Sequence, residues 1–137
     1  MTKNSLSCAL IHHIEKDPYL LMIKNNEGVW TLPNRRTAKD CCDKELGKMF
    51  KRTTSLPVPE INNVSILQNG GSSVYVGSIG HIDTSKFKKT KYSNSIGFIS
   101  LDMLRKNKFL PNGSSLSIEP QTAELLKNMD GSDMFDL

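Results

Sequence analysis

The side chains best suited to chemistry in this sequence are positive charges gathered in one segment. Between Arg35 and Arg52 the basic residues outnumber the acidic ones by seven to three, an excess equal to the net charge of +4 of the whole chain. Arginine binds phosphate through parallel N–H groups, so the segment could contact phosphates directly without a metal. A charge run of this kind is nevertheless more typical of a solvated surface. The candidate phosphate contacts are Arg35, Arg36, Lys48 and Arg52.

A second basic stretch, residues 86–92, interleaves four lysines with Phe87 and Tyr92. Aromatic rings among positive charges are typical of surfaces that bind single-stranded RNA or DNA, because the rings stack on bases. The stretch also fits a solvated loop held by two partly buried rings, and no recognisable RNA-binding motif decides between these interpretations. The candidate contacts are Lys88, Lys89, Lys91 and Tyr92.

Residues that could hold a metal or act as nucleophiles are few. His12 and His13 are adjacent in a strand-like run, so their side chains point to opposite faces and do not share a metal. The three cysteines include adjacent Cys41 and Cys42 without a Cys-x-x-Cys spacing, which disfavours a zinc site and indicates a reducing compartment, the cytoplasm. The carboxylates that remain as candidate metal ligands are Asp40, Asp43, Glu45 and Asp83.

Periodicity predicts the elements that position these residues. Strands are predicted at 7–14, 19–24, 29–32, 64–67, 74–79 and 96–99. An amphipathic helix is predicted to start from Thr37 as N-cap, because Cys42, Leu46 and Phe50 recur every four residues. A short helical turn and a last helix are predicted at 100–104 and 118–129. This order indicates an α+β fold in one domain.

Length and composition bound the function class. With 137 residues the chain has the size of one domain, expected at 1–129, and no apolar run is long enough to cross a membrane. We expect no secretory signal in the polar first residues. Residues 130–137 alternate acidic and apolar side chains. They are predicted to be a tail, either a frayed end or a docking peptide whose Met134, Phe135 and Leu137 insert into a partner.

The segment Trp30-Thr31-Leu32-Pro33-Asn34 and the helix after it resemble the signature of the Nudix family. That signature reads G-x5-E-x7-R-E-U-x-E-E-x-G-U, where U is apolar, and W-x-L-P-G usually precedes it. With Asn34 on the glycine, the chain follows the signature without a gap. The resemblance extends to residues 97–104 and to the last helix, and it implies a mixed β-sheet sandwiched between two helices.

The matched positions differ from the family in their chemistry. In the family, helix glutamates bind Mg²⁺ or Mn²⁺, which bridges a diphosphate and activates water. Here Asp40 falls on the first glutamate, while Met49, Arg52 and Thr53 fall on the later three. A thioether is a poor ligand for a hard cation and a guanidinium repels it. The resemblance therefore implies a degenerate box without a metal, a cofactor or a catalytic residue. Its positions are Asn34, Asp40, Lys48, Met49, Arg52 and Thr53.

A register shifted by one helical turn is the competing alignment. It places Lys44-Glu45-Leu46 on R-E-U and needs a deletion in the preceding loop. Glu45 would then be a lone carboxylate, with Lys48 three residues on and able to neutralise it. Both registers lose the metal site.

Three functions follow, in decreasing order of support from the sequence. The first is a catalytically inactive Nudix-fold protein that acts as a binding or structural subunit of a larger macromolecular assembly, with a protein partner and no membrane contact. The second is a metal-independent module that binds a nucleotide or RNA. The third is a hydrolase of nucleoside diphosphate derivatives whose displaced metal site uses Asp40, Asp43, Glu45 or Asp83.

Overall fold

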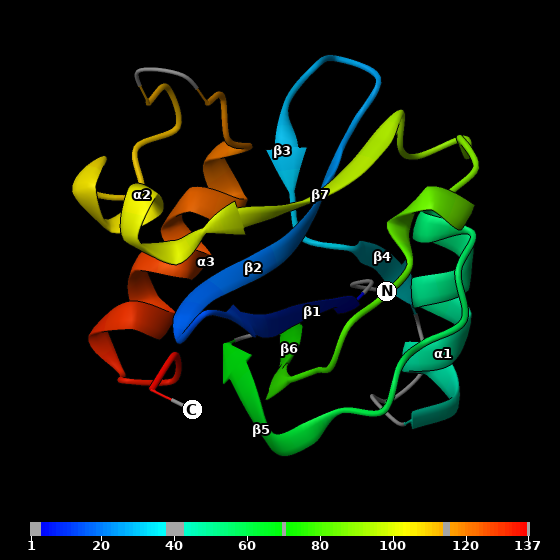
Figure 1. Ribbon diagram of the computed structural model, residues 1–137, viewed down its shortest axis with the longest axis horizontal. Helices are drawn as coiled ribbons and strands as arrows, with labels where there is room; N and C mark the ends of the chain where they lie inside the picture. Colours follow the sequence, from blue (N-terminus) through cyan, green and yellow to red (C-terminus); the bar gives the residue numbers. More distant parts are fainter. Residues whose placement is uncertain (1–3, 38–42, 70, 114–115, 137) are drawn as a thin grey trace.

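Apolar residues near the N-terminus form the middle of a seven-stranded mixed sheet (Figure 1). The computed structural model describes residues 4–37, 43–69, 71–113 and 116–136. The main strand order is β3-β2-β1-β6-β5, in which β1 and β6 are parallel and the other neighbours antiparallel. The strands are β1 (Asn4–Ile14), β2 (Asp17–Lys24), β3 (Trp30–Thr31), β4 (Asn34–Thr37), β5 (Asn62–Asn69), β6 (Ser72–Ser78) and β7 (Ser95–Ser100).

Helices cover both faces of this sheet. On one face α1 (Asp43–Thr54) packs through Leu46 and Phe50 against β1, and on the other α2 (Leu101–Lys106) and α3 (Pro120–Gly131) close a second apolar cluster (Figure 1). Residues of β1 alternate between the two clusters because successive side chains of a strand point to opposite faces. The predicted mixed sheet between helices is therefore confirmed.

All six predicted strands are present. Five are longer than predicted, and β3, predicted at 29–32, is shorter. The two-residue turn between β1 and β2 is Glu15-Lys16, whose φ angles of 51° and 74° are both positive. That combination is typical of the tight turns that join twisted antiparallel strands. The hairpin of β5 and β6 also confirms the turn expected at residues 69–72.

The start of α1 corrects one prediction. Thr37 is not the N-cap of the helix, because it belongs to β4 and pairs with Asn4 of β1. The predicted residues Asp40, Cys41 and Cys42 lie outside the described part of the chain.

The last helix starts two residues later than predicted. Pro120 is its first residue, a position where the missing N–H is no loss. The Glu119 carboxylate accepts hydrogen bonds from the N–H groups of Gln121 (3.1 Å) and Thr122 (2.8 Å), which makes Glu119 the N-cap. Ile118, predicted as helical, instead packs in the core beside Trp30.

The predicted tail is part of the packed structure. Helix α3 continues past the expected boundary at residue 129, and the Phe135 ring is only 3% exposed within the core. Met134 packs against the same cluster. Phe135 is therefore buried within this chain and does not belong to a frayed end. Met134 is partly buried, and Leu137 lies outside the described residues.

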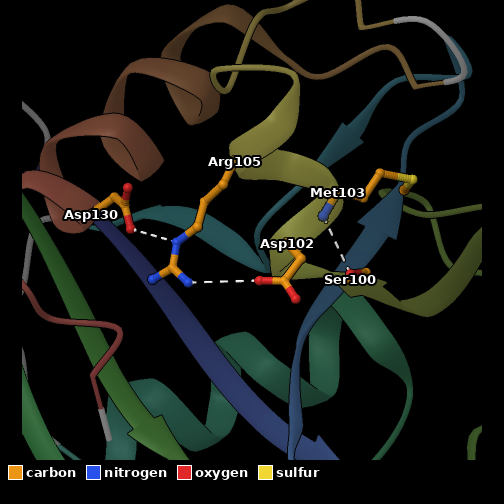
Figure 2. Close-up of polar contacts among 5 residues, drawn as sticks. All are labelled: Ser100, Asp102, Met103, Arg105 and Asp130. Atoms are coloured by element: carbon orange, nitrogen blue, oxygen red, sulfur yellow. Dashed lines mark hydrogen bonds and ion pairs between the residues drawn. The ribbon is translucent and has the colours of Figure 1, made fainter.

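An arginine joins α2 to α3 (Figure 2). The Arg105 Nε donates a hydrogen bond of 2.9 Å to Asp130, and its Nη1 lies 3.9 Å from the Asp102 carboxylate. Ser100 caps α2, since its Oγ accepts from the N–H of Met103. Arg105 is thus held between two carboxylates in a structural role.

Candidate functional site

The second half of α1 places two of the signature positions in the protein interior. Met49 is 0% exposed and Thr53 is 1% exposed, in contact with the cluster that includes Leu6 and Phe50. The Thr53 hydroxyl donates to the Met49 carbonyl at 2.9 Å, so it is used within the helix. One thioether and one internally bonded hydroxyl therefore stand where the alignment puts two glutamates.

Arg52, between these buried residues in the sequence, is exposed and lies against Tyr92. Its guanidinium carbon is 4.8 Å from the ring centroid, and its Nη2 donates to the Tyr92 hydroxyl. The Lys91 Nζ lies 5.9 Å from the centroid of the same ring. Two cations are thus already close to the Tyr92 ring, so the base stacking considered for it would require Arg52 or Lys91 to move.

The lysine-rich loop is fastened to the end of α1, which brings the two basic segments of the sequence together. The Thr53 carbonyl accepts hydrogen bonds from the hydroxyls of Ser93 and Thr90. The N–H of Lys88 donates to the Ser55 hydroxyl at 2.7 Å. These bonds hold Tyr92 at the side of the helix that carries Arg52.

A cleft of about 500 Å³ lies between β4 and the end of α1. Its lining residues are Asn34, Arg35, Arg36, Arg52, Thr53 and Tyr92. The Nε of Arg35 is buried and has no hydrogen-bond partner among the described residues. Within the described ranges, no ion pair joins a carboxylate to any of the three arginines. A buried donor and unpaired positive charges favour an anion in this cleft.

A second cleft, of about 360 Å³, continues from the first over the sheet toward α3. Asn34 and Arg36 line both clefts. The Asn34 side chain is held by a hydrogen bond that its Nδ2 donates to the Leu32 carbonyl at 2.6 Å. Two carboxylates, Glu119 and Glu124, also line this cleft. The rest of its lining is mostly uncharged and polar, and includes Ser5, Ser7, Ser72, Gln121, Thr122 and Asn128.

The structure separates the predicted anion contacts into two groups. Arg35, Arg36, Arg52 and Tyr92 share the first cleft. Lys88 and Lys89 are exposed on the adjoining loop, outside that lining. Lys48 is also outside it and is 3.8 Å from the Glu45 carboxylate. The polar cleft was not predicted from the sequence. One signal was available, because Ser5 and Ser7 are two residues apart in β1 and therefore place two hydroxyls on one face of the sheet.

The carboxylates considered as metal ligands are dispersed. Glu45 is buried and paired with Lys48, while Asp43 is exposed in the first turn of α1. Asp83 caps a short 3₁₀ helix (Thr84–Lys86), and hydrogen bonds from the Ser85 hydroxyl and N–H, then the charges of Lys86 and His81, lower its pKa. No group of three His, Cys, Asp or Glu side chains in the described ranges could hold a metal. The donors near Arg52 do not fit a hard cation.

No family model and no curated protein matches the sequence, whereas many solved structures match the fold. RenU, a Nudix hydrolase from M. smegmatis, superimposes with a TM-score of 0.68 over 95% of this chain and 84% of its own, at 11% identity. The NUDIX domain of Shewanella oneidensis NrtR, solved with ADP ribose, gives 0.62 over 96% and 89%, at 10% identity.

A third structure with this fold is part of a protein complex. The C-terminal domain of mouse MUTYH, solved with human PCNA, gives a TM-score of 0.57 over 97% of this chain and 90% of its own, at 10% identity. These likenesses show that the chain has the Nudix fold. Among the helices that the structure describes, none has the length and apolar character to cross a bilayer.

Proposed function

We propose that this chain is a catalytically inactive Nudix-fold protein that acts as a binding or structural subunit of a larger macromolecular assembly. The observation that carries the proposal is the end of α1. There, positions aligned with metal-binding glutamates hold a buried Met49, an internally bonded Thr53 and the cation Arg52. Mg²⁺ and Mn²⁺ require oxygen ligands, and like charges at contact distance repel by a few kcal/mol near a protein surface.

The backbone after α1 supports the gap-free alignment on which this proposal depends. In that alignment the closing glycine of the signature falls on Ser55, and Ser55 has a φ of 61°, directly after the helix ends at Thr54. Glycine is the residue that adopts this conformation without strain. The shifted alignment puts the glycine on Lys51, inside the helix.

An assay for hydrolysis tests the loss of catalysis. We expect no release of phosphate or nucleotide from ADP-ribose or dinucleoside polyphosphates with Mg²⁺ or Mn²⁺, and no Mn²⁺ bound by electron paramagnetic resonance, with an active Nudix hydrolase as positive control. Turnover that disappears with chelator and in Asp40→Asn, but persists in Asp102→Asn, would instead support the displaced metal site.

A protein partner is the part of the proposal that addresses biological role. The MUTYH domain, which shares this fold, was solved in complex with PCNA, so a domain with this fold can be part of a protein assembly. Affinity purification of the tagged chain from its native source should recover a partner in constant ratio after nuclease treatment. A chain recovered alone under those conditions would contradict the subunit role.

The arginine cleft favours a second candidate function, metal-independent binding of a nucleotide or RNA. Three arginines without carboxylate partners among the described residues meet a polar cleft, an arrangement suited to phosphates on one side and hydrogen-bonding groups on the other. NrtR, which shares the fold, was solved with ADP ribose.

Binding in chelator distinguishes nucleotide from RNA. If the clefts hold a nucleotide, the protein should bind ADP-ribose in EDTA. The double variant Lys88→Gln/Lys89→Gln should leave that affinity unchanged. Single-stranded RNA on the loop should lose affinity in that variant and become weaker as salt rises. The double variant Lys16→Gln/Lys106→Gln, which removes two exposed charges outside both clefts, is the charge-matched control for both ligands. Absence of binding for both would remove this candidate.

A further inference from the structure

The β5–β6 hairpin is an uncharged region in a charged protein. Residues 61–80 contain no Asp, Glu, Lys or Arg, although 23% of the chain is charged. Within the described part of the chain β5 pairs only with β6, so its other side is an edge of the sheet (Figure 1). Proteins usually protect such edges with charges or prolines, because unpaired N–H and C=O groups accept a further strand. The sequence of β5 has neither.

The same edge exposes apolar side chains. Val64 and Ile66 are each 48% exposed. Ile66 lies opposite Tyr75 of β6, a member of the cluster under α1, so both apolar side chains are on the α1 side of the sheet. Beside them is a groove of about 220 Å³, lined by Asp43, Leu46, Val58, Pro59, Ile61, Val64 and Tyr75. Helix α1 does not cover this border of the sheet.

We propose that a second copy of this chain docks here, through antiparallel pairing of the two β5 strands about a two-fold axis. With the axis beside Ile66, such pairing brings the Ile66 side chains of the two copies together and leaves Val64 of each copy at the border of the contact, which matches apolar surface with apolar surface. Charge selects this surface for a second copy. Two identical copies would bring like charges together at their basic surfaces, whereas residues 61–80 carry no charged side chain, so contact through the hairpins adds no such repulsion.

The size of the edge sets the strength of the contact. An eight-residue strand is roughly 27 Å long, and the register shift between Asn62 and Ser65, where Asn63 has a φ of 55°, leaves the flat part at 65–69. A contact of this size falls below about 1,200 Å², the low end of specific interfaces. We therefore expect a reversible dimer with a dissociation constant of roughly 10–100 µM.

Sedimentation equilibrium of the nuclease-treated full chain, from about 5 to 500 µM around that constant, tests the proposal. Ile66→Lys should weaken the dimer at least about tenfold, since it places two cations together at the two-fold axis. Leu110→Lys is the matched control, because Leu110 is 52% exposed on the loop after α2 and should change the constant less than about twofold. Thermal unfolding verifies that both variants fold.

Salt gives an independent readout, because an uncharged interface should keep its dissociation constant within about twofold between low and high ionic strength. A monomer at every concentration overturns the proposal, and so does a dimer that survives both Ile66→Lys and Val64→Lys. A dimer that dissociates in high salt would assign association to the basic surfaces. Hydrogen exchange in which only a different protein protects the β5 amides would assign the edge to that protein. This result, or dissociation in high salt, would also overturn the proposal.

Discussion

Arginines occur in two contrasting settings on the two sides of this molecule. On the α3 side, Arg105 lies between Asp130 and Asp102 (Figure 2). At the end of α1, Arg36 and Arg52 line a cleft without a carboxylate partner among the described residues. A guanidinium whose charge is matched within the fold stabilises that fold, whereas one left unmatched beside a cleft is available to an anion from outside. The same residue type therefore has a structural role on one side, and on the other it is available for the anion binding that we propose.

The largest expected effect is on the structural side. Phe135→Ala removes a ring that is 3% exposed in the α3-side core, so it should lower the free energy of unfolding by about 3–5 kcal/mol. Urea unfolding followed by circular dichroism measures this change, with the exposed Leu110→Ala as control at less than about 0.5 kcal/mol. A loss below about 1 kcal/mol would mean that the C-terminal turn is detached from the core.

The next effect should appear only in binding. Arg36→Gln combined with Arg52→Gln removes two charge-assisted contacts, so the affinity for ADP-ribose in EDTA should fall about 100-fold, or about 2.7 kcal/mol. Calorimetric titration measures the affinity. The free energy of unfolding should stay within about 0.5 kcal/mol, since both side chains are exposed. An unchanged affinity would contradict the role of these two arginines in anion binding.

The reciprocal substitution is Arg105→Gln. It should reduce the free energy of unfolding by about 1 kcal/mol, a value kept low because the ion pairs are partly exposed, and leave the ADP-ribose affinity unchanged. Asp102→Asn, at the longer distance of 3.9 Å, should have a smaller effect on unfolding. If Arg105→Gln weakened binding instead, the division between the two settings would fail.

The smallest effect concerns pH. Hydrogen bonds from Ser85 lower the pKa of Asp83 below its ordinary value of 3.8, because they favour the charged carboxylate. The stabilisation is present above that value and is lost as pH falls through the lower pKa of the folded state. A carbon-detected NMR titration should give a midpoint below 3.8, which Ser85→Ala should move back toward that value. A midpoint that Ser85→Ala does not shift would exclude this cap as the cause.

Local pattern was enough to predict most of the fold. Runs of apolar residues indicated β1 and β2, and the glycines near residue 70 indicated the β5–β6 hairpin. The polar segment Asn34–Thr37 gave no strand signal, because it becomes β4 only by pairing with distant residues at the start of β1. That pairing also explains why Thr37 does not cap α1.

Of the candidate site, only the positive charges were predicted from the sequence. The segment around Arg35 indicated anion binding, and the cleft does gather three of its arginines. What the sequence did not reveal was that hydroxyls at Thr90 and Ser93 fasten the Tyr92 loop to Thr53, or that Gln121 and Asn128 of α3 reach the same opening. Such contacts join segments far apart in the chain, so no local pattern contains them.

The parallel pairing of β1 with β6 has a consequence for how the chain folds. Ser5 and Ser72 share a hydrogen bond across 67 positions, at the centre of the sheet. Closing a loop of this length precedes any gain from the contact, so we expect the parallel pair in the middle of the sheet to form late in folding. During synthesis, β1 therefore has no central neighbour until the ribosome has made more than half of these 137 residues.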